Sequence, residues 1–342
     1  MADAPPRPMT LAAQRFDRTV PLFNRYVHVE HVMAVHSPAG NPSVEGLVRG
    51  IWDAAEIPVA RYTFLHDQGD EFTAIPVFPD RIFAQPYAYT TTESGINGPA
   101  DLRGRTVMMP GYYYTASFWH RAILREEYGV EATEIEWLVQ FPELDERMRH
   151  PDGVRVAVAP PGPPGDKRLL DGSIDALMTE AAPIFPPDQE HRIKRIFPGE
   201  DAGVRDWYRR TGYFPPVHVI AVRRSALEQW PGFGEALCRM YDASMAEAYR
   251  TLQNERLTSL PLMRAHLDET RKMFGDNPYP YGVEPNRAVL DKFLDLAHAE
   301  GFIRRRPAVE ELFDAPSMEY RFTAAMANGS PPGGGAFPAT NV

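Results

Sequence analysis

The segment SGINGPADLRGRTVMMPGYYYTASFWHRAILREEYGV, from Ser94 to Val130, contains the pattern that decides the fold class. Within it, Asn97-Gly98-Pro99 predicts a turn and TVMMP predicts a short buried strand. Thr115 to Tyr128 predicts a helix, because apolar residues recur four positions apart and Gly129 follows. The strand-like runs EIEWLV, GVRVAVAPP and IDALMTE come next. This alternation of strands and helices predicts an α/β unit.

The flanking segments predict a second α/β unit. Upstream, we expect two strands and then two helices, at Pro8 to Gln14, Tyr26 to Val35, Asn41 to Ala55 and Ile57 to Asp67. Downstream, VHVIAVRR (residues 217 to 224) is a strand-like run that leads back to the first part of the chain, and helical patterns follow it.

This organisation predicts two lobes and a tail. Lobe 1 would comprise residues 1–95 and 218–323, and lobe 2 residues 96–217. The Gly/Pro/Ser-rich end, residues 324–342, is predicted to be disordered. Since interfaces between domains commonly bind small molecules, we expect a ligand in the cleft between the lobes.

Composition excludes several function classes. The chain has 342 residues, 44% of them apolar, and a net charge of −10 without a long basic stretch, so nucleic acid is not an expected partner. Its single cysteine, Cys238, rules out an intramolecular disulfide and is expected to be a buried small hydrophobe. No run has the length of a signal peptide or a membrane span. We therefore expect a cytoplasmic protein with no membrane partner.

Cofactor signatures are absent from the sequence. It contains no HExxH, CxxC, GxGxxG or GxxxxGKS motif. His28, His31 and His36 cluster along one predicted strand, but residue 31 would point away from the other two, so the three cannot easily share a metal. The expectation is therefore no metal and no cofactor.

Seven blocks, in order, carry a family resemblance. They are FDRTVPL (16–22), IPVFPDRIF (75–83), the segment 94–130, LLDGSIDAL (169–177), YRRTGYFPPVHVIAVRR (208–224), YPYGVEPNRAVLDKFL (279–294) and ELFDAPS (311–317). Together they resemble the 4,5-dihydroxyphthalate decarboxylase family and span most of residues 8 to 318. The resemblance implies a two-lobed, type II periplasmic-binding-protein-like α/β fold with a C-terminal helical extension. It also implies a cofactor-independent decarboxylase, a lyase, acting on a small hydroxylated aromatic or heteroaromatic carboxylate.

Such a reaction needs a cation for a carboxylate, an acceptor near the phenol and a general acid over the ring carbon. Arg18 and Arg81 are the candidate carboxylate clamps, because each follows a predicted strand and offers a planar fork. Asp17 lies beside the first of them and is included in the predicted substrate site. The alternative is that each arginine only forms an ion pair, with Asp17 or Asp80 as partner.

Aromatic and hydroxyl side chains gather where the predicted helix at Thr115 begins. Backbone N–H groups at a helix start favour anions, and the side chains of Tyr112, Tyr113 and Trp119 can stack on an aromatic substrate. Thr115 is also a predicted substrate contact, with capping of the helix by Thr115 or Ser117 as the structural alternative.

His218, in FPPVHV, is the preferred general acid, and His120 is the second candidate, since imidazole titrates near neutrality. Glu284 could accept a phenolic proton, although a carboxylate that begins a helix is also favoured by the helix dipole. Tyr281 has similar standing as a substrate contact. The alternative for His218 is a structural, hydrogen-bonded histidine, and the alternative for His120 is a helical histidine that faces solvent.

Glu180 departs from the family pattern, in which a basic residue is expected shortly before a proline. A carboxylate there would disfavour a second substrate carboxylate, so a related acid is also an expected substrate. Two other functions stay open: a non-catalytic cytosolic solute-binding protein for a small aromatic acid, and a dehydratase-type enzyme on the same fold. The sequence leaves open whether the chain forms a homo-oligomer.

Overall fold

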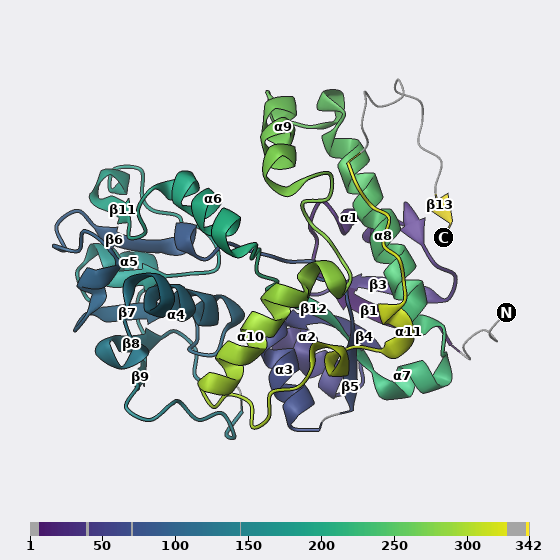
Figure 1. Ribbon diagram of the computed structural model, residues 1–342, viewed down its shortest axis with the longest axis horizontal. Coiled ribbons are helices and arrows are strands. Elements are labelled where there is room, and N and C mark those ends of the chain that lie inside the picture. The colour runs from purple at the N-terminus through teal and green to yellow at the C-terminus, as the bar shows by residue number, and fades with distance from the viewer. Residues whose placement is uncertain (1–6, 39–40, 70, 144, 327–339, 342) are drawn as a thin grey trace. The chain divides into compact units, whose positions relative to one another are not determined.

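The computed structural model describes residues 7–38, 41–69, 71–143, 145–326 and 340–341 (Figure 1). The chain divides into two compact units, which we describe separately. Unit 1 takes its described residues from Met1–Asp80, His218–Arg287 and Pro307–Val342, and unit 2 from Arg81–Val217 and Ala288–Arg306.

Unit 1 contains a five-stranded sheet in the order β3-β1-β4-β12-β5. Strand β1 runs parallel to β3 and β4, whereas β12 is antiparallel to both β4 and β5. The strands are β1 Met9–Ala13, β3 Val32–His36, β4 Ala54–Pro58, β5 Phe72–Ile75 and β12 His218–Arg223. A separate two-stranded pair joins β2 Val27–His28 to β13 Thr340–Asn341.

The first predicted strand is confirmed by β1, but two predictions in unit 1 are wrong. The strand expected at Tyr26 to Val35 is broken into β2 and β3 by a turn in which His31 has a φ of 66°. The helix expected at Asn41 to Ala55 ends at Val48, and Ala54 already belongs to β4. Since β4 lies between β1 and β12, its ladder hydrogen bonds and burial outweigh the low strand propensity of AAEIP.

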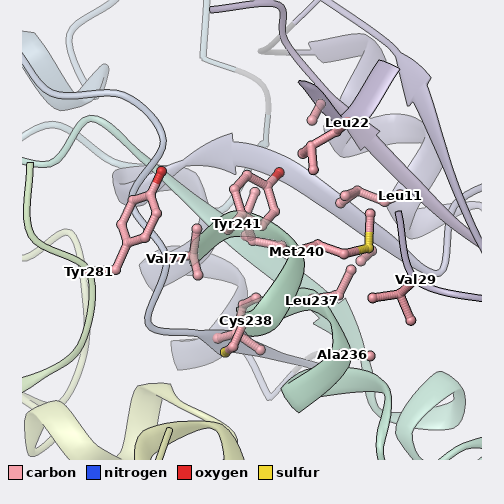
Figure 2. Close-up of a cluster of buried hydrophobic side chains, with 14 of the residues drawn as sticks. Leu11, Leu22, Val29, Val77, Ala236, Leu237, Cys238, Met240, Tyr241 and Tyr281 are labelled. Atoms are coloured by element: carbon pink, nitrogen blue, oxygen red, sulfur yellow. The ribbon is translucent and has the colours of Figure 1, made fainter. Parts of the chain in front are cut away.

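Helices cover this sheet and close the core of unit 1. They are α1 Val20–Phe23, α2 Asn41–Val48, α3 Val59–Asp67, α7 Arg224–Gln229, α8 Phe233–Leu252, α9 Met263–Phe274 and α11 Ala315–Met318, with 3-10 helices η5 Glu255–Leu257, η6 Glu284–Asn286 and η7 Val309–Leu312. Figure 2 shows how Leu237, Met240 and Tyr241 of α8 pack against Leu11 of β1 and Val77. Cys238 is fully buried in the same cluster, as predicted.

A buried carboxylate fixes the C-terminal segment along α8 (Figure 1). Asp242 accepts hydrogen bonds from the backbone N–H groups of Thr323 at 3.0 Å and Ala324 at 2.8 Å. Ala324 and Met326 are buried, so these first residues of the predicted disordered tail are packed on unit 1. The rest of that tail, except Thr340–Asn341, lies outside the described residues.

Unit 2 contains a six-stranded sheet in the order β11-β6-β10-β7-β8-β9. The four strands from β10 to β9 are mutually parallel, and β6 is antiparallel to both β10 and β11. The strands are β6 Ala88–Thr91, β7 Thr106–Met109, β8 Glu136–Val139, β9 Arg155–Val158, β10 Ala176–Met178 and β11 Ile193–Arg195. Because β6 pairs only with strands of this sheet, unit 2 begins at Arg81 rather than at the expected residue 96.

The helices of unit 2 include the one expected from the opening segment. They are α4 Thr115–Tyr128, α5 Gly165–Leu170, α6 Glu200–Thr211 and α10 Arg287–Ala299, with η1 Gln85–Tyr87, η2 Pro99–Leu102, η3 Ala132–Glu134 and η4 Glu190–Arg192. Helix α4 has the predicted bounds and ends at Gly129, which has a φ of 63°. The segment after α10 is tied to α4 by a buried ion pair between Arg121 and Glu300, with Nη2 and Oε2 2.6 Å apart. Among the described residues, no helix is long and apolar enough to cross a membrane.

Candidate functional site

One edge of the unit 1 sheet collects polar side chains from four separate strands. Because β1, β4 and β5 run in one direction and β12 in the other, three carboxyl ends and one amino end meet at this edge. Gln14 follows β1, Glu56 is the central residue of β4, Asp80 follows β5, and His218 begins β12. The carboxyl-end edge of an open α/β sheet is where such folds bind ligands.

Glu56 and His218 form a buried pair at the centre of this edge. The Nδ1 atom of His218 lies 2.8 Å from Oε1 of Glu56, and the Glu56 side chain is fully buried. Gln14 donates to the same carboxylate from its backbone N–H at 3.0 Å and from its side-chain amide at 3.4 Å. A carboxylate at hydrogen-bond distance favours a ring proton on Nδ1, although the Gln14 side-chain amide nitrogen also lies 3.4 Å from that atom.

Asp80 connects this pair to Arg18. One carboxylate oxygen of Asp80 lies 3.6 Å from Nη2 of Arg18, and the other lies 3.6 Å from Nδ1 of His218. The backbone N–H of His218 also donates to the Asp80 carbonyl at 3.3 Å. Two predicted site residues that are far apart in the sequence, Arg18 and His218, therefore each lie 3.6 Å from one carboxylate.

The loop FDRT positions Arg18 through the fully buried Thr19. The Thr19 hydroxyl donates to the Gln14 carbonyl at 2.6 Å and accepts from the Phe16 N–H at 2.8 Å, which closes the loop after β1. Ser244 of α8 donates to the Arg18 carbonyl at 2.7 Å. The loop that carries the arginine is thus fixed to both the sheet and α8.

The Arg18 guanidinium lies between two aromatic rings and is only 15% exposed. Its central carbon is 4.1 Å from the centroid of Phe16 and 4.4 Å from that of Tyr279. Burial opposes its charge, but the charges of Tyr279, Tyr281, Asp17 and Asp80 outweigh burial, so the pKa of Arg18 is raised. Asp17 is exposed and accepts from the Arg18 backbone N–H at 2.8 Å. Arg18 is therefore a permanently charged, oriented fork.

Two buried tyrosines border the same region. The rings of Tyr241 and Tyr281 are 6.2 Å apart, and Figure 2 shows their hydroxyl groups pointing to the same side of the cluster. Burial, together with the charge of Glu56, raises the pKa of Tyr241 well above its ordinary value. The Tyr241 hydroxyl thus stays protonated and can donate a hydrogen bond.

The predicted residues around α4 are buried inside unit 2. His120 places Nε2 2.8 Å from the Ala84 carbonyl, and burial lowers its pKa to about 4. Burial raises the pKa of Tyr112 to about 12, and the Arg121 guanidinium lies 3.8 Å from the centroid of that ring. The Tyr113 hydroxyl donates to the Arg149 carbonyl. These contacts describe packing inside unit 2.

Thr115 and Trp119 are also buried, and neither predicted cap forms. Thr115 is the first residue of α4 rather than its N-cap, which is Tyr114. The Ser117 hydroxyl donates to the Gly111 carbonyl at 2.8 Å. Trp119 packs edge-on against Trp207, with the ring centroids 6.4 Å apart.

Three further predicted residues lie away from the Arg18–His218 cluster or belong to unit 2. Arg81 is buried in unit 2, where Nη1 donates to the Phe214 carbonyl at 2.8 Å. Glu180 is exposed in the segment after β10. Glu284 begins η6 in unit 1 and forms an exposed ion pair with Arg287, which lowers the pKa of Glu284. Within unit 1, the structure brings together Arg18, Asp17, His218 and Tyr281.

Sequence reasoning missed Gln14, Glu56 and Asp80 as members of the site. The available signal was a charged residue inside a run of small and apolar ones, AAEIP, in which Glu56 falls between the two predicted helices, Asn41 to Ala55 and Ile57 to Asp67. Within the part of the chain that the structure describes, no group of three or more His, Cys, Asp or Glu side chains lies close enough to hold a metal ion.

Two solved structures with a similar fold are named as solute-binding proteins. The periplasmic aliphatic sulphonate binding protein of Escherichia coli is 15% identical, with a TM-score of 0.51 over 90% of this chain and 97% of its own. The alkanesulfonate-binding protein of Xanthomonas axonopodis pv. citri, bound to MOPS, is 15% identical, with a TM-score of 0.53 over 91% and 99%. At this level of identity the likeness shows the fold alone, and it confirms the predicted two-lobed type II periplasmic-binding-protein fold.

Curated relatives identify the family. No protein-family model matches the chain. A 4,5-dihydroxyphthalate decarboxylase of Pseudomonas putida is 28% identical over 168 residues, 47% of this chain and 65% of that protein. A 4,5-dihydroxyphthalate decarboxylase of Comamonas testosteroni is 32% identical over 321 residues, 91% of this chain and 97% of that protein. As its motif blocks predicted, the chain belongs to the 4,5-dihydroxyphthalate decarboxylase family.

Proposed function

We propose that this chain is a cofactor-independent carboxy-lyase that removes CO2 from a small hydroxylated aromatic or heteroaromatic carboxylate resembling 4,5-dihydroxyphthalate. The observation that carries the proposal is the Arg18–Asp80–His218 arrangement, in which one carboxylate lies 3.6 Å from both the guanidinium and the imidazole. A fixed cation and a titratable proton donor at one sheet edge are two of the three groups that the reaction requires.

Proton transfer from Nε2 of His218 to the ring carbon that bears the carboxylate would begin the reaction. A hydroxyl para to that carbon supplies electron density and releases its proton, so the ring passes through a dienone. The C–CO2 bond then breaks, its electron pair restores the aromatic ring, and the oxygen takes a proton back. The net change consumes one proton for each CO2 released, which solvent returns to His218.

Arg18 would hold the carboxylate that is retained. A bound diacid needs one anion fixed while the other is lost, because a cation on the departing carboxylate would stabilise the ground state instead. The stacking of Arg18 between Phe16 and Tyr279 reduces the freedom that the guanidinium loses on binding. The hydroxyls of Tyr241 and Tyr281 are candidate donors to the oxygen atoms of the substrate.

Release of CO2 from three matched compounds tests this function. Purified protein is incubated with 4,5-dihydroxyphthalate, 4-hydroxyphthalate and phthalate, and CO2 is followed by 13C NMR of carboxyl-labelled material. We expect turnover only where a hydroxyl lies para to a carboxylate, so phthalate is the unreactive control. Tight binding of both hydroxylated acids without any CO2 would instead favour a non-catalytic solute-binding protein. The cytoplasmic location and homo-oligomerisation stay predictions.

A further inference from the structure

We propose that Glu56 is a positioning residue for catalysis, which fixes the tautomer of His218 and favours its imidazolium, so that Nε2 carries the proton delivered to the substrate. The kinetic part of this inference rests on the proposed decarboxylase function. The structural part, which concerns the tautomer of His218, can be tested without any substrate.

The sheet places Glu56 and His218 on the same face of adjacent strands. In the register of β4 and β12, Ile220 lies opposite Glu56 and His218 lies opposite Pro58, so the two side chains form a diagonal pair. Their contact, 2.8 Å between Nδ1 and Oε1, is the shortest among the described ion pairs of this cluster. Two β-strands, rather than flexible loops, therefore set the geometry of the pair.

A buried carboxylate at position 56 destabilises the fold unless its charge has partners. Every other residue of β4 from Ala54 to Ile57 is a fully buried apolar one, and Glu56 is also fully buried. Burial of an unpaired carboxylate destabilises a fold more than burial of a neutral polar group does. The contacts with Gln14 and His218 offset that cost, and an apolar residue would avoid it altogether.

A purely structural role for Glu56 makes a different prediction. In that case Glu56 would serve to accept the hydrogen bond from the Gln14 backbone N–H and so fix the loop after β1, and its contact with the His218 ring would have no effect on catalysis. The two roles separate when the charge is removed but the shape is kept. Glu56→Gln retains an oxygen acceptor yet loses the charge, whereas Glu56→Asp retains the charge on a shorter side chain.

Nitrogen NMR of the histidine rings gives the substrate-free test. The protein is labelled with 15N-histidine, and the His218 signals are assigned by their loss in His218→Asn. We expect the neutral ring of the wild type to carry its proton on Nδ1, and Glu56→Gln to shift the population toward the Nε2–H tautomer. A wild-type ring that carries its proton on Nε2 at high pH would overturn the inference, whatever the activity.

The pH profile of turnover gives the kinetic test. We expect Glu56→Gln to lower kcat about 10- to 100-fold and to move the descending limb of the profile to lower pH by about one unit, because a neutral amide no longer favours the imidazolium. Glu56→Asp, which keeps the charge, should show a smaller decrease in kcat and a smaller shift of the descending limb than Glu56→Gln. The other charged or titratable groups near the pair are Arg18, Asp80, Tyr241 and Tyr281, which all variants retain.

Asp242→Asn is the matched control, because it alters a buried carboxylate of the same unit that binds only the segment Tyr320 to Ala324 among the described contacts. It should lower the melting temperature and leave the pH profile unchanged. A Glu56→Gln profile that coincides with wild type, in a folded variant, would overturn the positioning role. If the wild type itself releases no CO2, the proposed function fails, and the NMR result still decides whether Glu56 sets the tautomer.

Discussion

Substitution of Arg18 by glutamine tests whether this arginine binds the ligand or only stabilises the fold. The guanidinium is 15% exposed and stacked between Phe16 and Tyr279, so it reaches a ligand already desolvated and oriented. Removing one partner of such a charge-assisted pair costs about 2–5 kcal/mol. A central value of about 3 kcal/mol corresponds to a roughly 150-fold rise in Kd.

Calorimetric titration with phthalate measures this loss, since phthalate carries the two carboxylates but lacks the hydroxyl that the reaction needs. Arg18→Lys keeps the charge and loses the planar fork, so we expect a smaller loss of about tenfold. Arg49→Gln, which removes an exposed arginine paired with Glu45, is the matched control and should bind normally. An Arg18→Gln protein that is folded and binds phthalate within threefold of wild type would refute the clamp and leave Arg18 as an ion-pair residue.

Two further predictions concern groups buried in unit 2. Arg121→Met leaves Glu300 without its buried partner and should lower the free energy of unfolding by about 3–5 kcal/mol, as measured by thermal unfolding. The double variant Arg121→Met/Glu300→Leu should recover most of that stability. A double variant that is as unstable as the single one would contradict this prediction. Burial lowers the pKa of His120 to about 4, so the free energy of unfolding should depend on pH through this residue. The ring titrates near pH 6.5 in the unfolded chain. The stability that the neutral, buried His120 contributes is therefore complete above that pH, and it falls by about 3 kcal/mol as the pH drops to 4. Urea unfolding of His120→Gln should lack that decrease, and an unchanged pH dependence would contradict it.

The order of the motif blocks was enough to predict the fold and the family, and several elements of unit 2 followed from periodicity, although β11 and α6 were not predicted. Helix α4 has the bounds expected from its apolar spacing and from Gly129. Short buried strands such as β7 were also found, because TVMM is apolar and lies between turn residues. These are segments in which local preference and tertiary position agree.

The candidate site was predicted only in part, and there is a physical reason why its other residues were not predicted. Arg18 and His218 were found because each is a charged or titratable residue beside a predicted strand. Glu56 was missed together with its strand, since Ala and Glu favour helices and only the place of β4 between β1 and β12 makes AAEIP extended. Asp80 was weighed only as an ion-pair partner, because its contact with His218 depends on a pairing of distant segments.

Turnover and binding by His218→Asn test the central claim most directly. The variant keeps a polar side chain of similar size but cannot deliver a proton, and general acid catalysis contributes about 10²–10⁴-fold. We predict a phthalate Kd within about threefold of wild type and a loss of kcat of at least about 100-fold on the hydroxylated acid. A folded His218→Asn protein that retains more than a tenth of the wild-type kcat would contradict it.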